Sequence, residues 1–205
     1  ERNKTDKKDA WHICMYGIER RPAQYEMPEQ QYFECRTLNS SIETITAEIT
    51  AFTNKIYAQK KQKTDTAAVL RSYHQIIKTL KAELKKLKAE LQKKMLLWQP
   101  GLVKQVSSVK GIGSRATATL IVATQGFKNT HSYQQLISYA GLSPKEYRSG
   151  KSIRGRVRIS KKGGKQLRHI LYMCALNAKV TNSACKALYD RLVAKGKNKK
   201  LALIA

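Results

Sequence analysis

Two long runs of apolar residues, spaced alternately by three and four positions, constrain the fold more than any other feature of the sequence. The runs extend over residues 38–56 and 70–91, and the polar stretch QKKQKTD at 59–65 separates them. Such spacing is typical of a coiled-coil seam. We therefore expect two antiparallel helices joined by a turn. The seam residues are Leu38, Ile42, Ile45, Ile49, Phe52 and Ile56, followed by Leu70, Tyr73, Ile77, Leu80, Leu84, Leu87 and Leu91.

The outer faces of this hairpin are rich in lysine. A purely structural hairpin, contacts with nucleic acid and contacts with a second protomer all remain open. Prolines divide the rest of the chain, because Pro22 and Pro28 follow a helix expected from residue 5 to about 20, and Pro100 ends the hairpin. The sequence predicts a mainly α-helical fold with three regions, 1–22, 23–98 and 99–205.

Two glycines after Pro100 predict a tight turn between short helices. The segments GLVKQVSSV and ATATLIVAT flank KGIGSR, an arrangement typical of a helix-hairpin-helix motif. Gly111 and Gly113 permit the turn, and the N–H groups that begin the second helix could hold a phosphate beside Arg115. An inert turn is the alternative. If the turn binds phosphate, valine at either glycine should weaken binding without unfolding the domain.

The charge of the chain points to a polyanionic partner. The net charge is +26, and residues 101–205 hold 21 Lys and Arg against Glu146 and Asp190 alone. Such an excess is usual in proteins that bind nucleic acid. No apolar run approaches the ~20 residues of a membrane-spanning helix, so no membrane partner is expected. The four cysteines form no CxxC pair, which favours reduced thiols in the cytoplasm.

The strongest concentration of charge is the segment 145–168, with ten Lys and Arg against one Glu. Alternation in SIRGRVRIS suits a small β-hairpin or an extended loop. A hydroxyl among cations could attack phosphorus, and the candidates are Ser149, Tyr147, Ser152 and Ser160, unless the segment only clamps the backbone. The residues expected to contact nucleic acid are Gly111, Gly113, Arg115, Arg148, Lys151, Arg154, Arg156, Arg158, Lys161, Lys162, Lys165 and Arg168.

Two aspartates near the beginning of the chain form a second candidate site. Asp6 and Asp9 stand three apart at a helix start, where they would share one face and could bind Mg²⁺ together with further acids. In the alternative interpretation, Asp6 is the N-cap and Asp9 a first-turn acid that complements the helix dipole.

The order of these segments resembles one known family. The segments NKTDKKDA, VKGIGSRATATLIVAT, AGLSPKEYRSGKSIRGRVRISKKGG and RLVAKGKNKK look like those of the DEDD-type insertion-sequence transposases. These are bridge-RNA-guided serine recombinases related to the pilin-gene invertases. The resemblance implies a RuvC-like domain that ends within 1–22, a coiled-coil hairpin at 23–98, and a transposase domain at 99–205.

The resemblance also implies an activity. In that family four acids bind Mg²⁺ and a serine becomes covalently attached to DNA. Asp6 and Asp9 match the last two acids, and Ser149 matches the nucleophile. The partners implied are DNA, a structured guide RNA and further copies of the chain in a dimer or tetramer, in a prokaryotic cytoplasm at the nucleoid. The family's first two acids have no counterpart here. We therefore expect a piece of a longer protein that binds DNA but does not cleave it alone.

Overall fold

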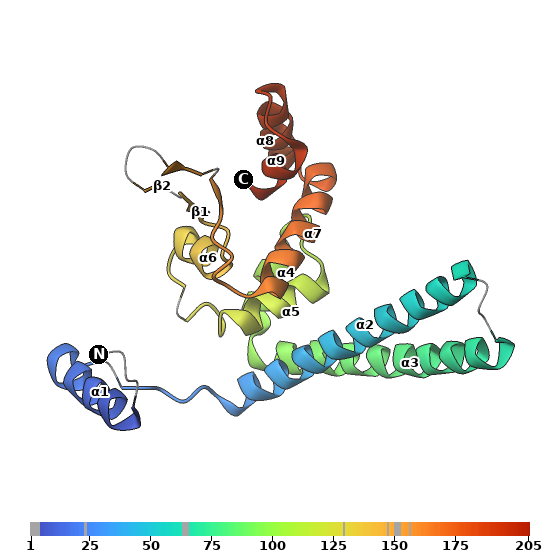
Figure 1. Cartoon of the computed structure of the whole chain (residues 1–205), viewed down its shortest axis with the longest axis horizontal. Helices are drawn as coiled ribbons and strands as arrows, with labels where there is room; N and C mark the ends of the chain where they lie inside the picture. Colours follow the sequence, from blue (N-terminus) through green and yellow to red (C-terminus); the bar gives the residue numbers. More distant parts are fainter. Residues whose placement is uncertain are drawn as a thin grey trace.

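The computed structural model describes residues 5–22, 24–62, 66–128, 130–146, 148–149, 153–155 and 157–205. The fold is mainly α-helical, as the sequence predicts (Figure 1). The helices are α1 (Asp6–Arg20), α2 (Gln30–Gln62), α3 (Ala67–Trp98), α4 (Pro100–Ser107), α5 (Ser114–Ala123), α6 (Tyr133–Tyr139), α7 (Lys165–Thr181), α8 (Ser183–Ala194) and α9 (Lys199–Ile204). The strands are β1 (Pro144–Lys145), β2 (Arg148–Ser149), β3 (Ile153–Arg154) and β4 (Arg158–Ile159).

Helices α2 and α3 form the predicted antiparallel hairpin (Figure 1). All of the predicted seam residues are buried or half-buried. Ile42, Ile56, Ile77 and Leu91 are the most enclosed, and each is at most 8% exposed. The burial follows from the alternating spacing, which keeps one apolar stripe of each helix against its partner. The apolar residues of the seam are therefore buried by packing within a single chain.

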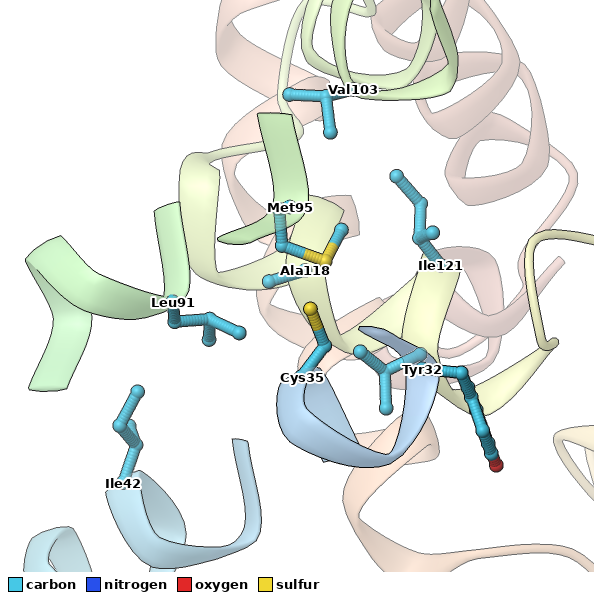
Figure 2. Packing of buried hydrophobic residues seen from close by; sticks show 9 residues of the cluster. Tyr32, Cys35, Ile42, Leu91, Met95, Val103, Ala118 and Ile121 are labelled. Atoms are coloured by element: carbon cyan, nitrogen blue, oxygen red, sulfur yellow. The ribbon is translucent and has the colours of Figure 1, made fainter. Parts of the chain in front are cut away.

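Helix α5 lies at the centre of the remaining helices. Residues 116–122 are all buried, and the helix contacts α2, α3, α4 and α7. Figure 2 shows the side chains of Cys35, Met95 and Ala118 gathered in this core, where Ile121 is fully buried. Small residues such as Ala118 allow this close approach. The open end of the hairpin consequently shares one hydrophobic cluster with α4 and α5, and a second cluster joins Leu120 of α5 to Ala140 and to Leu167 of α7.

The strands form a narrow hairpin between α6 and α7, which confirms the first of the two alternatives for this segment. Strand β1 pairs with β4 in antiparallel fashion, and β2 pairs with β3. The register shifts between the two pairs. Lys145 faces Arg158, whereas Arg148 faces Arg154, so that two residues (146 and 147) separate the pairs on one side and three (155 to 157) on the other.

Helix α1 stands apart from the rest of the molecule. Within the described ranges it makes no contact with another helix or strand, and Figure 1 shows it at the far end of the linker before α2. Its N-cap is Thr5, whose hydroxyl accepts a 3.4 Å hydrogen bond from the amide of Lys8. The interpretation of Asp6 as the N-cap is therefore wrong by one residue. Asp9 is a first-turn acid, as that interpretation held.

Candidate functional site

The hairpin of strands β1 to β4, called here the basic hairpin, is anchored at its base to the end of α6. The amide of Ser160 donates to the carbonyl of Ser143 at 2.8 Å, and the amide of Lys161 donates to the carbonyl of Gly141 at 2.9 Å. Gly141 has a φ of 69°, a conformation that glycine adopts without strain, and it closes α6. The hairpin thus leaves the helical core from a fixed point and carries its cations away from it.

Arg168 reinforces this anchor. Its Nη1 atom donates to the carbonyls of Ala140, at 3.1 Å, and Gly163. The guanidinium therefore joins the end of α6 to the turn that precedes α7, and it is only half-exposed. Gly163 belongs to the same contact, because a Cβ atom there would collide with the carbonyl of Tyr139. The sequence also predicts Arg168 as a phosphate contact, which stays a prediction, and it did not indicate the role of Gly163. The double glycine at 163 and 164 was the available signal.

Other predicted phosphate contacts are open to solvent. Arg158, Lys161, Lys162 and Lys165 are exposed. Arg148 and Arg154 lie opposite each other in β2 and β3. Lys151 and Arg156 lie outside the described residues. The exposed cations line the base of the hairpin on the side that leads into α7.

Ser149 is the last residue of β2 and pairs with Ile153 of β3. This backbone position is next to the connection between the two strands. Tyr147 and Ser152 lie outside the described part of the chain. Ser160 is half-buried at the hairpin base, where its amide is already bonded. The backbone thus separates Ser149, at the far end of the hairpin, from Ser160, at its root.

The turn that contains Gly111 and Gly113, called here the glycine turn, joins α4 to α5 where the sequence predicts it. Gly111 has a φ of 109°, and a Cβ atom there would lie 2.7 Å from the Cβ of Ala178. Contrary to the expectation from the sequence, valine at 111 should therefore destabilise the domain, since both the backbone conformation and the close contact favour glycine. Gly113 differs, because a Cβ atom there meets nothing within 4 Å. Its role as a phosphate contact stays a prediction.

Gly113 is the N-cap of α5, and no side chain caps this helix end. Gly113, Ser114 and Arg115 are exposed. The turn also contacts Cys174 of α7. Burial raises the pKa of the Cys174 thiol, and a hydrogen bond from the Gly113 backbone opposes that shift. The N-terminus of α5 is thus held against α7 on one side and faces solvent on the other.

A polar cluster joins α2 to α5 beside this turn. Thr119 donates a 3.3 Å hydrogen bond to Oδ1 of Asn39, whose Nδ2 donates to Oε1 of Glu43 at 2.7 Å. Burial raises the pKa of Glu43, while Asn39 and the charge of Arg115 lower it. The cluster borders a cavity of about 230 Å³. Sequence reasoning missed it, because its members are brought together only by the tertiary fold.

The predicted acids are not brought to the basic hairpin. Asp6 is exposed and Asp9 half-buried in the first turn of α1, a helix without contacts to the other described elements. No group of three or more His, Cys, Asp or Glu side chains able to hold a metal occurs in the described ranges. Two carboxylates are suitable donors for Mg²⁺, but they form an incomplete ligand set.

Comparison with known proteins relates the helical region to transposases. Residues 103–190 match the family described as Transposase IS116/IS110/IS902 family. The chain is 35% identical over 101 residues to the pilin gene-inverting protein of Moraxella bovis, covering 49% of this chain and 31% of that protein. It is 32% identical over 99 residues to the insertion element IS110 uncharacterized 43.6 kDa protein of Streptomyces coelicolor, covering 48% and 24%.

The pilin gene-inverting protein of Moraxella lacunata is similar to the same degree, at 34% identity over 101 residues. The matched region therefore spans about a third or less of the length of these relatives. Residues 103–190 are thus similar to the domain that the IS116/IS110/IS902 transposase family shares. The match includes the glycine turn, the basic hairpin and most of α7 and α8. In the described part of the chain, no helix has the length and apolar character that crossing a membrane requires.

Proposed function

We propose that the chain is part of a DNA transposase or recombinase whose basic hairpin binds the scissile region of DNA. The observation that carries this proposal is the transposase match over 103–190, which contains a rooted, cation-lined hairpin. Since Arg168 and Gly163 fix the hairpin base, the exposed cations can meet phosphates without first ordering a loop. Eight such contacts would lower affinity by about 10³–10⁵-fold between 50 and 200 mM salt.

Ser149 is the proposed nucleophile. Its Oγ would attack the scissile phosphorus and form a phosphoserine ester, while the bond from phosphorus to the leaving deoxyribose oxygen breaks. The serine proton leaves to a base, and the departing oxygen takes up a proton. Cations on both sides of the hairpin would stabilise the charge that develops on the phosphate oxygens. The position of Ser149 at the far end of the hairpin, away from its root, supports this assignment.

Asp6 and Asp9 are the proposed Mg²⁺ ligands of the full-length protein, in which further acids would complete the set. When bound, the metal would supply charge stabilisation at the phosphate. We further propose that the whole protein acts in a prokaryotic cytoplasm as a dimer or tetramer directed by a structured guide RNA. The division into 1–22, 23–98 and 99–205 belongs to the same proposal.

The test is a trapping experiment with the full-length protein, Mg²⁺, guide RNA and a DNA substrate nicked near the cleavage site. The nick lets the leaving strand diffuse away, so that the covalent adduct accumulates and is seen as a slow band on a denaturing gel. Ser149→Ala should abolish the adduct and leave DNA affinity nearly unchanged, because one neutral hydroxyl adds little to binding dominated by phosphate contacts. Asp6→Asn or Asp9→Asn should also abolish it.

Tyr147→Phe is the matched control and should retain the adduct. If the adduct survives in Ser149→Ala and is lost in Tyr147→Phe, the nucleophile is the tyrosine. Cleavage without any adduct would indicate a RuvC-type nuclease that uses water. Neither cleavage nor adduct in any variant, with DNA binding intact, would leave the hairpin a non-catalytic clamp.

A further inference from the structure

One face of the coiled-coil hairpin carries an uninterrupted row of basic side chains that the proposed active site does not use. The row, called here the α3 stripe, follows a spacing of three and four residues along α3. Its members are Arg71, His74, Lys78, Lys81, Lys85 and Lys88. All are exposed. None of them has an ion-pair or hydrogen-bond partner among the residues that the structure describes.

The stripe is straight and long. At 100° and 1.5 Å per residue, its members fall within an arc of about 100° and extend over about 25 Å of helix. Successive members are about 4.5–6 Å apart along the axis. Like charges at such spacings destabilise a helix. The row of like charges therefore destabilises α3. Binding of an anionic ligand would explain why the row is present.

The acids of α3 are gathered on the opposite flank. Glu83 and Glu90 lie roughly 100–180° around the helix from the stripe. On that flank Lys86 pairs with Glu83 at 2.7 Å, and Lys94 pairs with Glu34 of α2 at 2.8 Å. Two lysines on that flank are therefore paired with acids. The helix thus separates a flank of mixed charge from a side of single sign.

Helix α2 offers no counter-charge along most of the stripe. The positions of α2 that flank the seam on the stripe side are neutral: Asn39, Thr46 and Thr53. The hydroxyls of Thr46 and Thr53 are bonded to carbonyls of their own helix. The acid on this side is Glu43, which is already occupied by Asn39 and by the charge of Arg115. The stripe consequently faces solvent as an uncompensated line of charge.

We propose that the α3 stripe is a second docking surface for the phosphodiester backbone of duplex DNA, separate from the basic hairpin. A line of cations without apolar members fits a regular polyanion better than a protein surface. A second copy of this chain is a poor occupant, because the chain has only 14 Asp and Glu against 40 Lys and Arg. The proposal rests on the proposed function, which names DNA as the ligand, and duplex RNA is the alternative occupant that the test distinguishes.

The stripe and the glycine turn lie toward the same side of the hairpin. Helix α5 packs on α2 through Thr119 and Asn39, and Arg115 at its beginning acts on Glu43. Asn39 belongs to the flank of α2 that borders the stripe. A duplex along the stripe would therefore run toward the exposed N-terminus of α5, and the long hairpin would extend the footprint beyond the transposase domain.

The test measures binding of the 205-residue chain to fluorescein-labelled duplex DNA, and to duplex RNA, by anisotropy over a salt series. The variant K78Q/K81Q/K85Q/K88Q should lower the slope of log K against log salt by about 3–4 for DNA, at roughly 0.9 per phosphate contact. A larger slope change for RNA than for DNA would overturn DNA as the occupant and assign the stripe to RNA. Glutamine keeps helix propensity, and circular dichroism verifies the fold of each variant.

A matched pair separates a site from a general effect of charge. K81Q/K88Q removes two stripe lysines, and K86Q/K93Q removes two exposed lysines of the same helix at the same separation but on another face. The first pair should lower the slope by about 2, and the second by much less. Equal effects of the two pairs, or no effect of the first pair, would contradict the proposal that the α3 stripe binds a duplex. If the stripe variants bind with an unchanged slope of log K against log salt, the proposal for the α3 stripe is wrong while the proposed function of the basic hairpin stands. If the unaltered chain binds neither duplex, both fail.

Discussion

Gly111 lies so close to Ala178 of α7 that a Cβ atom at position 111 would come within 2.7 Å of the Cβ of Ala178 and 2.9 Å of its Cα. The turn between α4 and α5 is therefore seated directly on α7. Since Gly111 also has a φ of 109°, two independent requirements select glycine here.

We expect Gly111→Ala to destabilise the fold by about 1–3 kcal/mol from backbone strain alone, with a further cost from the collision. Urea unfolding followed by circular dichroism measures the loss. Gly113→Ala is the matched control and should change stability by about 1 kcal/mol or less, because a Cβ atom there has open space. Ala178→Gly should rescue Gly111→Ala only in part, since the Cα of residue 178 remains. Equal stability of the two alanine variants would contradict the seating of the turn.

Arg168 and Lys165 carry the same charge at the beginning of α7 but differ in their surroundings. Arg168 donates to the carbonyls of Ala140 and Gly163, whereas Lys165 is exposed. Arg168→Gln should lower the free energy of unfolding by about 1–3 kcal/mol, because the carbonyls of Ala140 and Gly163 lose their donor. Lys165→Gln should change it by about 0.5 kcal/mol or less.

The same two variants should differ in the opposite sense in DNA binding. Lys165→Gln should reduce the salt slope by about 1, as expected for a phosphate contact. A similar reduction in Arg168→Gln, without loss of stability, would support Arg168 as a phosphate contact and contradict its role in the anchor. Thermal melting and anisotropy on the same preparations give both readings.

Cys35 should resist alkylation and make stability sensitive to alkaline pH. Burial, together with Glu34, raises the pKa of its thiol from 9.0 to about 11, and Lys94 opposes the shift. Since the folded value is the higher one, the stability tied to this thiol is fully present below pH 9. It is lost as pH rises from 9 toward 11. Burial disfavours the thiolate in the folded chain, whereas in the unfolded chain the thiol is exposed to water and ionises at its ordinary pKa.

Mass spectrometry after brief iodoacetamide treatment at pH 8 should find Cys14 and Cys185, which are exposed, modified before Cys35. In urea titrations, the stability difference between the unaltered chain and Cys35→Ala should narrow between pH 9 and 11. A constant difference, or prompt alkylation of Cys35, would contradict the burial of this thiol at the junction of α2 and α5.

Local patterns in the sequence predict those parts of the fold that depend on spacing. The seam from Leu38 to Leu91 follows directly from alternating steps of three and four, and the turn at Gly111 follows from glycines between two apolar helices. The basic hairpin was predicted only as one of two alternatives. Its register shift could not be predicted, since it depends on strand pairing across a connection.

Contacts between distant segments were beyond prediction from the sequence. Thr119 and Asn39 are 80 residues apart, and nothing in either local sequence indicates their hydrogen bond. Arg168 looks like its neighbours in a run of cations, and its difference lies in two carbonyls that other segments supply. For the candidate site, the sequence predicts the cations and Ser149 as a set, and their roles stay predictions. It could not separate those that anchor the hairpin from those that remain free for a ligand.

The hairpin of α2 and α3 joins the other described helices near its open end, through residues such as Cys35, Asn39 and Met95 (Figure 1). Its 33-residue helix α2 extends about 50 Å, so that the hairpin is a lever fixed at one end. A force applied at the tip acts with a long arm on α5, whose buried faces contact α7 as well. Torque on the coiled coil would thereby reach α7, the helix whose Arg168 anchors the base of the basic hairpin.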